Sequence, residues 1–173
     1  NDTAGVTMVA SGGSTNVAEG GVTDSYTVVL DSQPTSTVRI TFATSTYGVI
    51  LDTDHLDFTS LNWNTPQTVT VTATDDSVYE GAHVSLISST VSVPSGFAYG
   101  YASLSIPDLS VSITDNDAAG VTVSSVTGSA TEAGGTATYT VVLDSQPTST
   151  VTIALTADTS IVSLSASTLS FTS

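Results

Sequence analysis

The sequence contains no cysteine, and it contains almost no positive charge. Without cysteine, neither a disulfide framework nor a thiolate metal site can form. Arg39 is the single basic side chain against sixteen acidic ones, for a formal net charge of −15. Such a balance argues against binding to nucleic acid, whose phosphates need a basic face, and against binding to anionic membrane surfaces. An acidic chain without compensating charge either binds cations or stays soluble through charge repulsion.

Long apolar runs and helical periodicity are also missing. No run approaches the length of a membrane span, so we expect no membrane insertion. The chain begins at Asn1 and not at methionine, and we interpret it as a mature or internal part of something longer. Its targeting signals are then not visible in this sequence.

Threonine, serine and valine dominate what is present, and polar and apolar residues alternate along the chain. Segments such as "TVRITFA" (37–43) and "QTVTVTAT" (67–74) have the period of two that is typical of half-buried strands, and β-branched residues suit a pleated surface. Turn signals such as "EGG" and "DSQP" separate the runs. The pattern predicts an all-β fold, an immunoglobulin-like antiparallel β-sandwich of about seven strands per repeat. The predicted strands are 5–11, 24–30, 36–43, 55–60, 66–74, 82–93 and 101–114.

A long internal repeat sets the domain organisation. The segment "YTVVLDSQPTSTV" occurs at 26–38 and again at 139–151, an offset of 113 residues. At the same offset Glu19 matches Glu132. This period is a whole domain and is too long for a solenoid unit. The sequence therefore predicts one complete repeat at 1–115 and the N-terminal half of a second repeat at 116–173.

Six of the sixteen acidic residues lie in three connections of the first repeat, counting the end of its last predicted strand as the third. Because consecutive strands of such a sandwich run alternately up and down, these three connections are expected at one pole. Carboxylates that converge in this way need a cation, and hard oxygen ligands select Ca²⁺. Acids isolated at strand ends, such as Asp31 and Asp144, are interpreted as turn residues instead. The candidate calcium ligands are Glu19 in the first connection, Asp75, Asp76 and Glu80 in the second, and Asp115 and Asp117 in the third.

The first repeat resembles a Calx-beta domain, the module of sodium–calcium exchangers, of an integrin β subunit and of bacterial surface arrays. The resemblance is carried by "EGG…YTVVL", by "NWNTPQTVTVTATDDSVYEG" and by the closing "VSITDND". In calcium-binding members it implies ligands at the same six positions. The chain departs from the family pattern at Asn116, an uncharged residue that lowers the total charge of the ligands. The family also has a ligand between the third and fourth strands, and in this chain it has a counterpart only if Asp52 or Asp54 reaches the site. The smaller ligand set favours a structural role over switching.

Other chemistry-bearing residues have simpler interpretations. His55 and His83 are the only histidines, and no nucleophile turn or metalloprotease motif accompanies them, so we expect no enzyme. Trp63 is interpreted as packing over the end of the sandwich, with a sugar-stacking platform as the alternative. Tyr99 and Tyr101 form either an exposed aromatic patch or edge-strand packing.

The second repeat has the equivalents of only the first four predicted strands, and its core face would be open. It is either an arbitrary cut from an array, the ordered part of a longer chain, or a half that another chain completes by strand addition or swapping. The leading hypothesis is a non-enzymatic, extracellular, calcium-stiffened repeat of a filament or adhesin-like surface protein, which associates with itself or with neighbouring repeats. The alternatives are a carbohydrate- or surface-binding adhesin module and a calcium-sensing domain.

Overall fold

The computed structural model describes residues 2–45, 48–94 and 96–173. The chain forms two compact units. The first unit consists of Asn1–Asp76 and Ala82–Asn116, and the second consists of Ser77–Gly81 and Asp117–Ser173. The first unit holds the complete predicted repeat except for five residues of one connection. The boundaries that the sequence predicts for the two repeats stay a prediction.

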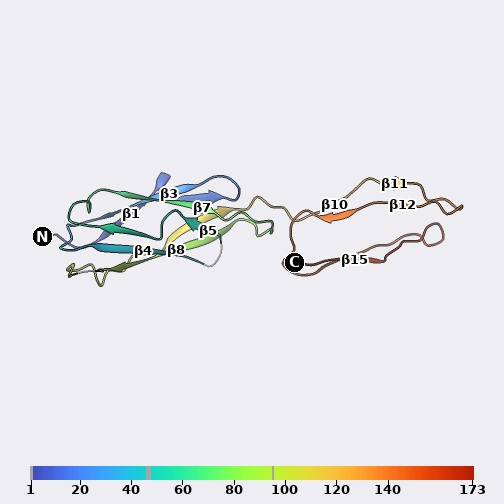
Figure 1. The fold of residues 1–173 in the computed structure, drawn as a ribbon. Coiled ribbons are helices and arrows are strands. Elements are labelled where there is room, and N and C mark those ends of the chain that lie inside the picture. Colours follow the sequence, from blue (N-terminus) through green and yellow to red (C-terminus); the bar gives the residue numbers. More distant parts are fainter. Residues whose placement is uncertain (1, 46–47, 95) are drawn as a thin grey trace. The chain divides into compact units, whose positions relative to one another are not determined.

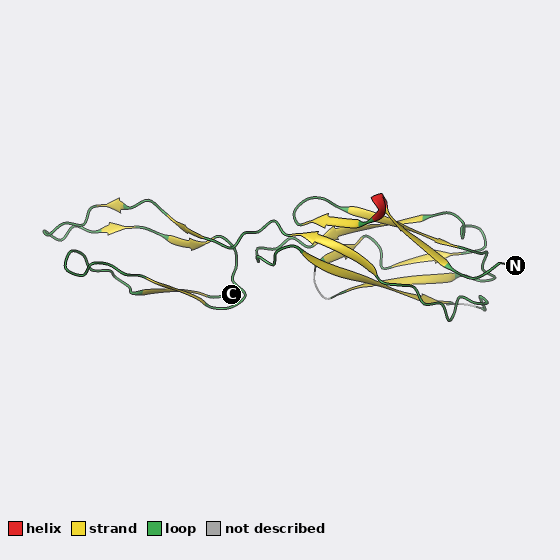
Figure 2. Ribbon diagram, turned by 180° about the vertical axis from the view of Figure 1, so that it is seen from behind, coloured by secondary structure: helices red, strands yellow, loops and turns green. Residues whose placement is uncertain are grey.

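Two β-sheets make up the first unit, and they appear as two layers in Figure 1 and Figure 2. Sheet A has the order β1-β3-β7-β5, and all of its pairs are antiparallel. Its strands are β1 (Val6–Ala10), β3 (Asp24–Leu30), β7 (Gln67–Ala73) and β5 (Val49–Leu51). Sheet B has the order β2-β9-β8-β4-β6. Its strands are β2 (Thr15–Ala18), β9 (Leu109–Thr114), β8 (His83–Ser92), β4 (Val38–Thr44) and β6 (His55–Phe58).

Sheet B contains one parallel pair, β2 with β9, while its other pairs are antiparallel. The chain changes sheets between β1 and β2 through the short 3-10 turn η1 (Ser11–Gly13). Gly12 and Gly13 have φ of 64° and 89° there, a left-handed conformation that glycine adopts without steric cost. The immunoglobulin-like β-sandwich that the alternation predicts is therefore present. The short strands β2 and β5 are additions to the seven that were predicted.

The core lies between the two sheets and follows the alternation of the strands. In β3 the side chains of Tyr26, Val28 and Leu30 are buried, while the residues between them are half-buried. Tyr26 packs edge-on against Phe42 of β4, with ring centroids 5.8 Å apart. Burial, with a further contribution from the negative charge of Asp52, raises the pKa of the Tyr26 hydroxyl above its ordinary value.

The last strand of the first unit is shorter than predicted. The sequence predicts a strand over 101–114, but β9 begins at Leu109. Tyr101 lies in the preceding irregular segment, where it is buried, and its hydroxyl donates to the carbonyl of Ser32 over 2.6 Å. The hydrogen bond from Tyr101 to Ser32 therefore holds this segment in an irregular conformation, although a strand was predicted there. Tyr101 is part of the core, and only Tyr99, which is 84% exposed, fits the predicted aromatic patch.

The second unit consists of three two-stranded antiparallel pairs. A parallel bridge between Val78 and Gln146 joins its two chain segments, and the amide of Gln146 donates to the carbonyl of Ser77 over 2.6 Å. From Asp117 to Ser173 no residue is buried. Its strands are β10 (Val121–Val123) with β13 (Val141–Leu143), β11 (Thr127–Gly128) with β12 (Ala137–Thr138), and β14 (Val151–Ala154) with β15 (Thr168–Phe171).

Among the described residues, no helix has both the length and the apolar character that crossing a membrane requires.

Candidate metal centre

The parallel pairing of β2 with β9 positions two of the predicted ligands. Ala18 is the register partner of Thr114, so Glu19 and Asp115 are the next residues along two strands that run in the same direction. The amide of Glu19 donates to the carbonyl of Thr114 over 3.0 Å and extends the ladder by one bond. Both carboxylates therefore leave the sheet at the same end.

Three carboxylates meet at this end of sheet B. One oxygen each from Glu19, Asp115 and Asp117 lies within 4.8 Å of the other two. Two oxygens that bind one Ca²⁺ at about 2.4 Å are at most about 4.8 Å apart, so this spacing fits a shared calcium ion. Glu19 is only 4% exposed, and the two aspartates are half-buried. The donor set is hard oxygen throughout and suits Ca²⁺ better than softer metals.

A tight turn after β2 brings a fourth predicted ligand close to this cluster. Gly20 has φ of 64°, and a Cβ atom at Gly20 would lie 2.8 Å from the side-chain nitrogen of Asn116 and 3.3 Å from a carboxylate oxygen of Asp75. The amide of Asn116 donates to that carboxylate oxygen over 3.0 Å. Glycine is thus required at position 20 for its backbone conformation and for space. The turn, Asp75 and Asn116 pack together beside Glu19.

Asn116 has a part in this packing that the sequence alone does not predict. The sequence indicates a residue that lowers the ligand charge, whereas in the structure the side-chain amide of Asn116 donates to the Asp75 carboxylate. The glycines in "EGG" are the signal that marks the close approach of Asp75 and Asn116 to Gly20, because a larger residue would collide with them.

The other predicted ligands are not in the three-carboxylate cluster. Asp76 follows Asp75 after β7, and Glu80 belongs to the second unit. Neither is a member of the acidic group found among the described residues. Their assignment as calcium ligands stays a prediction.

The two residues considered for a further ligand are engaged in other contacts. A carboxylate oxygen of Asp52 accepts the amide of Thr70 over 2.9 Å. Asp54 pairs with the Nδ1 atom of His55 over 2.6 Å, and this hydrogen bond lowers the pKa of the Asp54 carboxyl. Both contacts hold these carboxylates at sites other than the three-carboxylate cluster, and neither residue is in that group.

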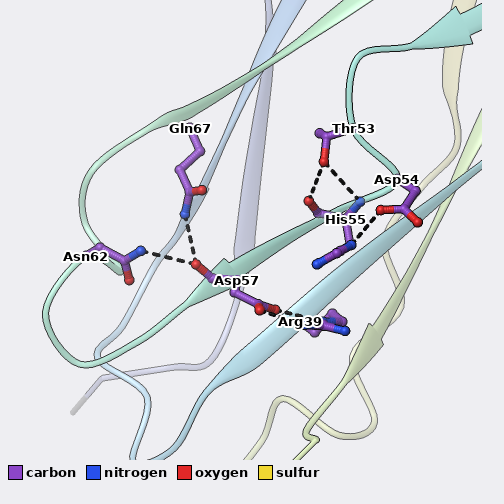
Figure 3. Close-up of polar contacts among 7 residues, drawn as sticks. All are labelled: Arg39, Thr53, Asp54, His55, Asp57, Asn62 and Gln67. Carbon is purple, nitrogen blue, oxygen red and sulfur yellow. Dashed lines mark hydrogen bonds and ion pairs between the residues drawn. The ribbon is translucent and has the colours of Figure 1, made fainter.

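The single arginine of the chain is also used elsewhere. Its guanidinium binds both carboxylate oxygens of Asp57, at 2.8 and 2.7 Å (Figure 3). The same figure shows the Asp57 carbonyl accepting the side-chain amides of Asn62 and Gln67, each over 3.1 Å. The hydrogen bond from Arg39 lowers the pKa of the Asp57 carboxyl.

Charge repulsion in the cluster is therefore not relieved by a lysine or arginine side chain. The chain has no lysine, and Arg39 is bound to Asp57. Two unit charges 4.8 Å apart repel by about 3 kcal/mol at an effective dielectric constant of about 20. A bound divalent cation would replace this repulsion with attraction. The cluster of Glu19, Asp115 and Asp117 can thus hold a metal ion.

Trp63, the candidate for a sugar platform, is tied into the fold. Its side chain is partly buried against the core, and its carbonyl accepts the amide of Leu30 over 3.0 Å. This agrees with the interpretation that Trp63 packs against the end of the sandwich. The large exposed aromatic side chains nearest in sequence to Tyr101 are Phe97 and Tyr99.

No family model matches the sequence, and the search of curated proteins returned no match. Three similar solved structures are described as the apo form of the Calx CBD1 domain, the calcium-binding domain CBD12 of CALX1.1, and CBD12 from CALX1.2. Their identities are 18%, 17% and 16%, and their TM-scores are 0.43, 0.42 and 0.43. The matches cover 65%, 63% and 79% of this chain, and 98%, 44% and 69% of the other chains. At these identities and TM-scores, the assignment of metal ligands rests on the side-chain geometry described above and not on the comparisons.

Proposed function

We propose that this chain is a calcium-binding structural repeat of an extracellular surface protein and that its role is mechanical. The observation that carries the proposal is the meeting of Glu19, Asp115 and Asp117 within 4.8 Å at the ends of two parallel strands. The burial of Glu19 strengthens it, because an ionised carboxylate is rarely buried without a compensating charge.

Calcium is the ion that this donor set favours. The cluster offers carboxylates only, without the imidazole or thiolate ligands that zinc and copper prefer. Calcium takes about 6–8 oxygens in flexible geometry, so backbone carbonyls and water complete the shell. Asp75, Asp76 and Glu80 are the further carboxylates that we propose as ligands or as outer partners.

The mechanical role follows from where the ligands lie in the chain. Asp115 and Asp117 lie in the segment that links the first sequence repeat to the second, and Glu19 lies in the connection that follows β2. An ion bound to all three restrains this linking segment against the end of sheet B. In an array of such repeats, each linking segment would be stiffened in the same way.

The chemistry of the described residues supports a structural and not an enzymatic role. The cluster presents buried or half-buried carboxylates at the end of a sheet. The histidine–aspartate pair of His55 and Asp54 is partly exposed and bonds locally between neighbouring residues. We therefore assign no catalytic residue.

Thermal unfolding of the full chain, with calcium and then with excess chelator, tests the proposal. Calcium at one hundred times its dissociation constant should stabilise the fold by about 2.7 kcal/mol. Calcium should therefore raise Tm, and Asp115→Asn should remove most of this rise. Asp108→Asn is the matched control because Asp108 precedes β9 and Asp115 follows it, so the same charge is removed at the opposite end of one strand.

Either of two results would contradict the proposal. One is an unfolding temperature that does not respond to millimolar calcium. The other is an equal loss of the calcium response in both variants, which would indicate a nonspecific effect of net charge.

A second function has one observation in its favour. Phe97 and Tyr99 are 82% and 84% exposed, and aromatic faces of this kind stack on sugars. A carbohydrate-binding module would give a glycan-array signal that Tyr99→Ala abolishes and Trp63→Phe preserves. The structural repeat gives no such signal.

A further inference from the structure

Asn116 stands between two of the clustered carboxylates in the sequence, and its side chain contacts a fourth carboxylate. The amide nitrogen of Asn116 donates to Oδ1 of Asp75 over 3.0 Å. An ionised carboxylate accepts hydrogen bonds and donates none, so the amide has to present its N–H group to Asp75. Both residues belong to the first unit. An oxygen of Asp75 is therefore engaged with an uncharged donor.

Asp75 lies outside the three-carboxylate cluster. The oxygens of Glu19, Asp115 and Asp117 lie within 4.8 Å of one another, and Asp75 is not a member of that group. Oxygens that share one Ca²⁺ are at most about 4.8 Å apart. The fourth carboxylate is thus connected to the cluster through Asn116, but it is not among the oxygens that one ion would gather.

The turn at Gly20 fixes this arrangement. A Cβ atom at Gly20 would lie 2.8 Å from Nδ2 of Asn116, and 3.3 and 3.5 Å from the two carboxylate oxygens of Asp75. Both side chains therefore pack against the backbone of the residue that follows Glu19. Packing as close as this leaves the Asp75 carboxylate little room to move.

A hydrogen-bond donor can satisfy a carboxylate where a second cation would otherwise be required. Carboxylates that converge without a donor or a cation repel one another. Asp75 has such a donor in the amide of Asn116. An aspartate at position 116 would replace this donor with another carboxylate beside Asp75, and the two would need an ion of their own. The uncharged side chain thus removes the demand for a second ion.

We propose that Asn116 is a positioning residue that holds Asp75 outside the calcium shell and limits the site to one ion. This inference rests on the proposed calcium site. The three-carboxylate cluster supplies the ligands, and Asp75 acts on it through Asn116, whose backbone joins two of them. Asp75 thereby has a different role from the ligand role that the resemblance to Calx-beta domains implies.

Calorimetric titration of calcium into the full chain compares two matched variants. Asp75→Asn keeps an oxygen that accepts from Asn116, so its calcium affinity should fall by less than about tenfold, the low end of what outer partners of metal ligands usually cost. Asp115→Asn makes the same chemical change in a proposed ligand and should lose much more affinity. Equal losses in the two variants would overturn the outer position of Asp75.

The ion count is the second readout of the same titrations. Asn116→Asp removes the donor and adds a carboxylate beside Asp75, so it should bind one calcium ion more than the unmodified chain. Asp75→Asn should bind the same number as the unmodified chain, because Asp75 holds no ion there. An unchanged count in Asn116→Asp would overturn the limit to one ion.

Thermal unfolding in excess chelator tests the hydrogen bond without calcium. Asn116→Asp places a negative charge against Asp75 and should lower Tm under these conditions. Ser112→Asp is the matched control, because it adds the same charge on the exposed face of β9. An equal fall in Tm for both variants would contradict the pairing of Asn116 with Asp75.

These outcomes separate the role of Asn116 from the proposed function. An unmodified chain that binds no calcium contradicts both. Calcium binding that Asp75→Asn and Asp115→Asn weaken equally keeps the calcium site and rejects only the role given to Asn116.

Discussion

The second unit repeats strands from the first part of the first unit, yet among the described residues only the first unit has a buried core. The hydroxyl of Thr7 donates to Asp31 over 2.7 Å in the first unit, and the hydroxyl of Thr122 donates to Asp144 over 2.6 Å in the second. The backbone amide of each of these aspartates also donates to a glycine carbonyl at the matching position, that of Gly5 over 2.9 Å and that of Gly120 over 3.0 Å. Local hydrogen bonding is thus reproduced in both copies.

Burial is not reproduced. Val38, Ile40 and Phe58 are fully buried in the first unit, while no residue from Asp117 to Ser173 is buried. A strand and its turn can form from local sequence, but hydrophobic stabilisation requires the opposing strands that exclude water. The repeated segment therefore specifies its own strands and turns, but it buries a core only where opposing strands cover it.

The largest expected difference is between two equivalent phenylalanines. Phe58→Ala removes a fully buried ring and should lower the free energy of unfolding by about 3–5 kcal/mol at every protein concentration. Phe171→Ala should cost about 1 kcal/mol or less in dilute solution, because the ring is only half-buried there. Urea unfolding of the two variants measures both costs, and equal costs would refute the contrast.

A smaller effect is expected from the ion pair of Arg39 with Asp57, which the second copy lacks. Arg39 and Asp57 are register partners in the first unit, and Thr152 and Ser170 are partners at the same place in the second. The double variant Arg39→Thr with Asp57→Ser should therefore keep the strand pairing and lower Tm only slightly, because the pair is partly exposed.

The pH dependence of that variant has a defined sign. Arg39 lowers the pKa of Asp57 in the folded state, so the pair stabilises the protein above the ordinary aspartate pKa of about 3.9. This contribution is lost as the pH falls through the lowered value. The difference in Tm between the variant and the unmodified chain should thus narrow below about pH 4. A difference that grows in acid would contradict the assignment.

Much of the sandwich could be predicted from the alternation of residues. The predicted strand 24–30 coincides with β3, and 82–93 contains β8. The strands β2 and β5 were missed because four and three residues are too few to establish a period of two. The start of β9 was placed too early, since the buried Tyr101 resembles a strand residue although a loop holds it.

The metal centre could be predicted in part. Counting strand directions brings the connection of Glu19 and the end of the last strand to one pole, and the structure places Glu19, Asp115 and Asp117 together. The count ignores individual side chains. It therefore predicts neither the hydrogen bond between Asn116 and Asp75 nor the absence of Asp76 and Glu80 from the three-carboxylate group.

The comparison of the two copies also gives the most direct test of the calcium site. Glu19 lies in the complete repeat beside two aspartates, whereas its counterpart Glu132 is exposed and belongs to no such group among the described residues. Isothermal titration of calcium into the full chain, into Glu19→Gln and into Glu132→Gln would compare the two directly. The account predicts that Glu19→Gln abolishes or strongly weakens binding, while Glu132→Gln binds calcium as the unmodified chain does. Unchanged binding in Glu19→Gln, or no binding by the unmodified chain at millimolar calcium, would contradict it.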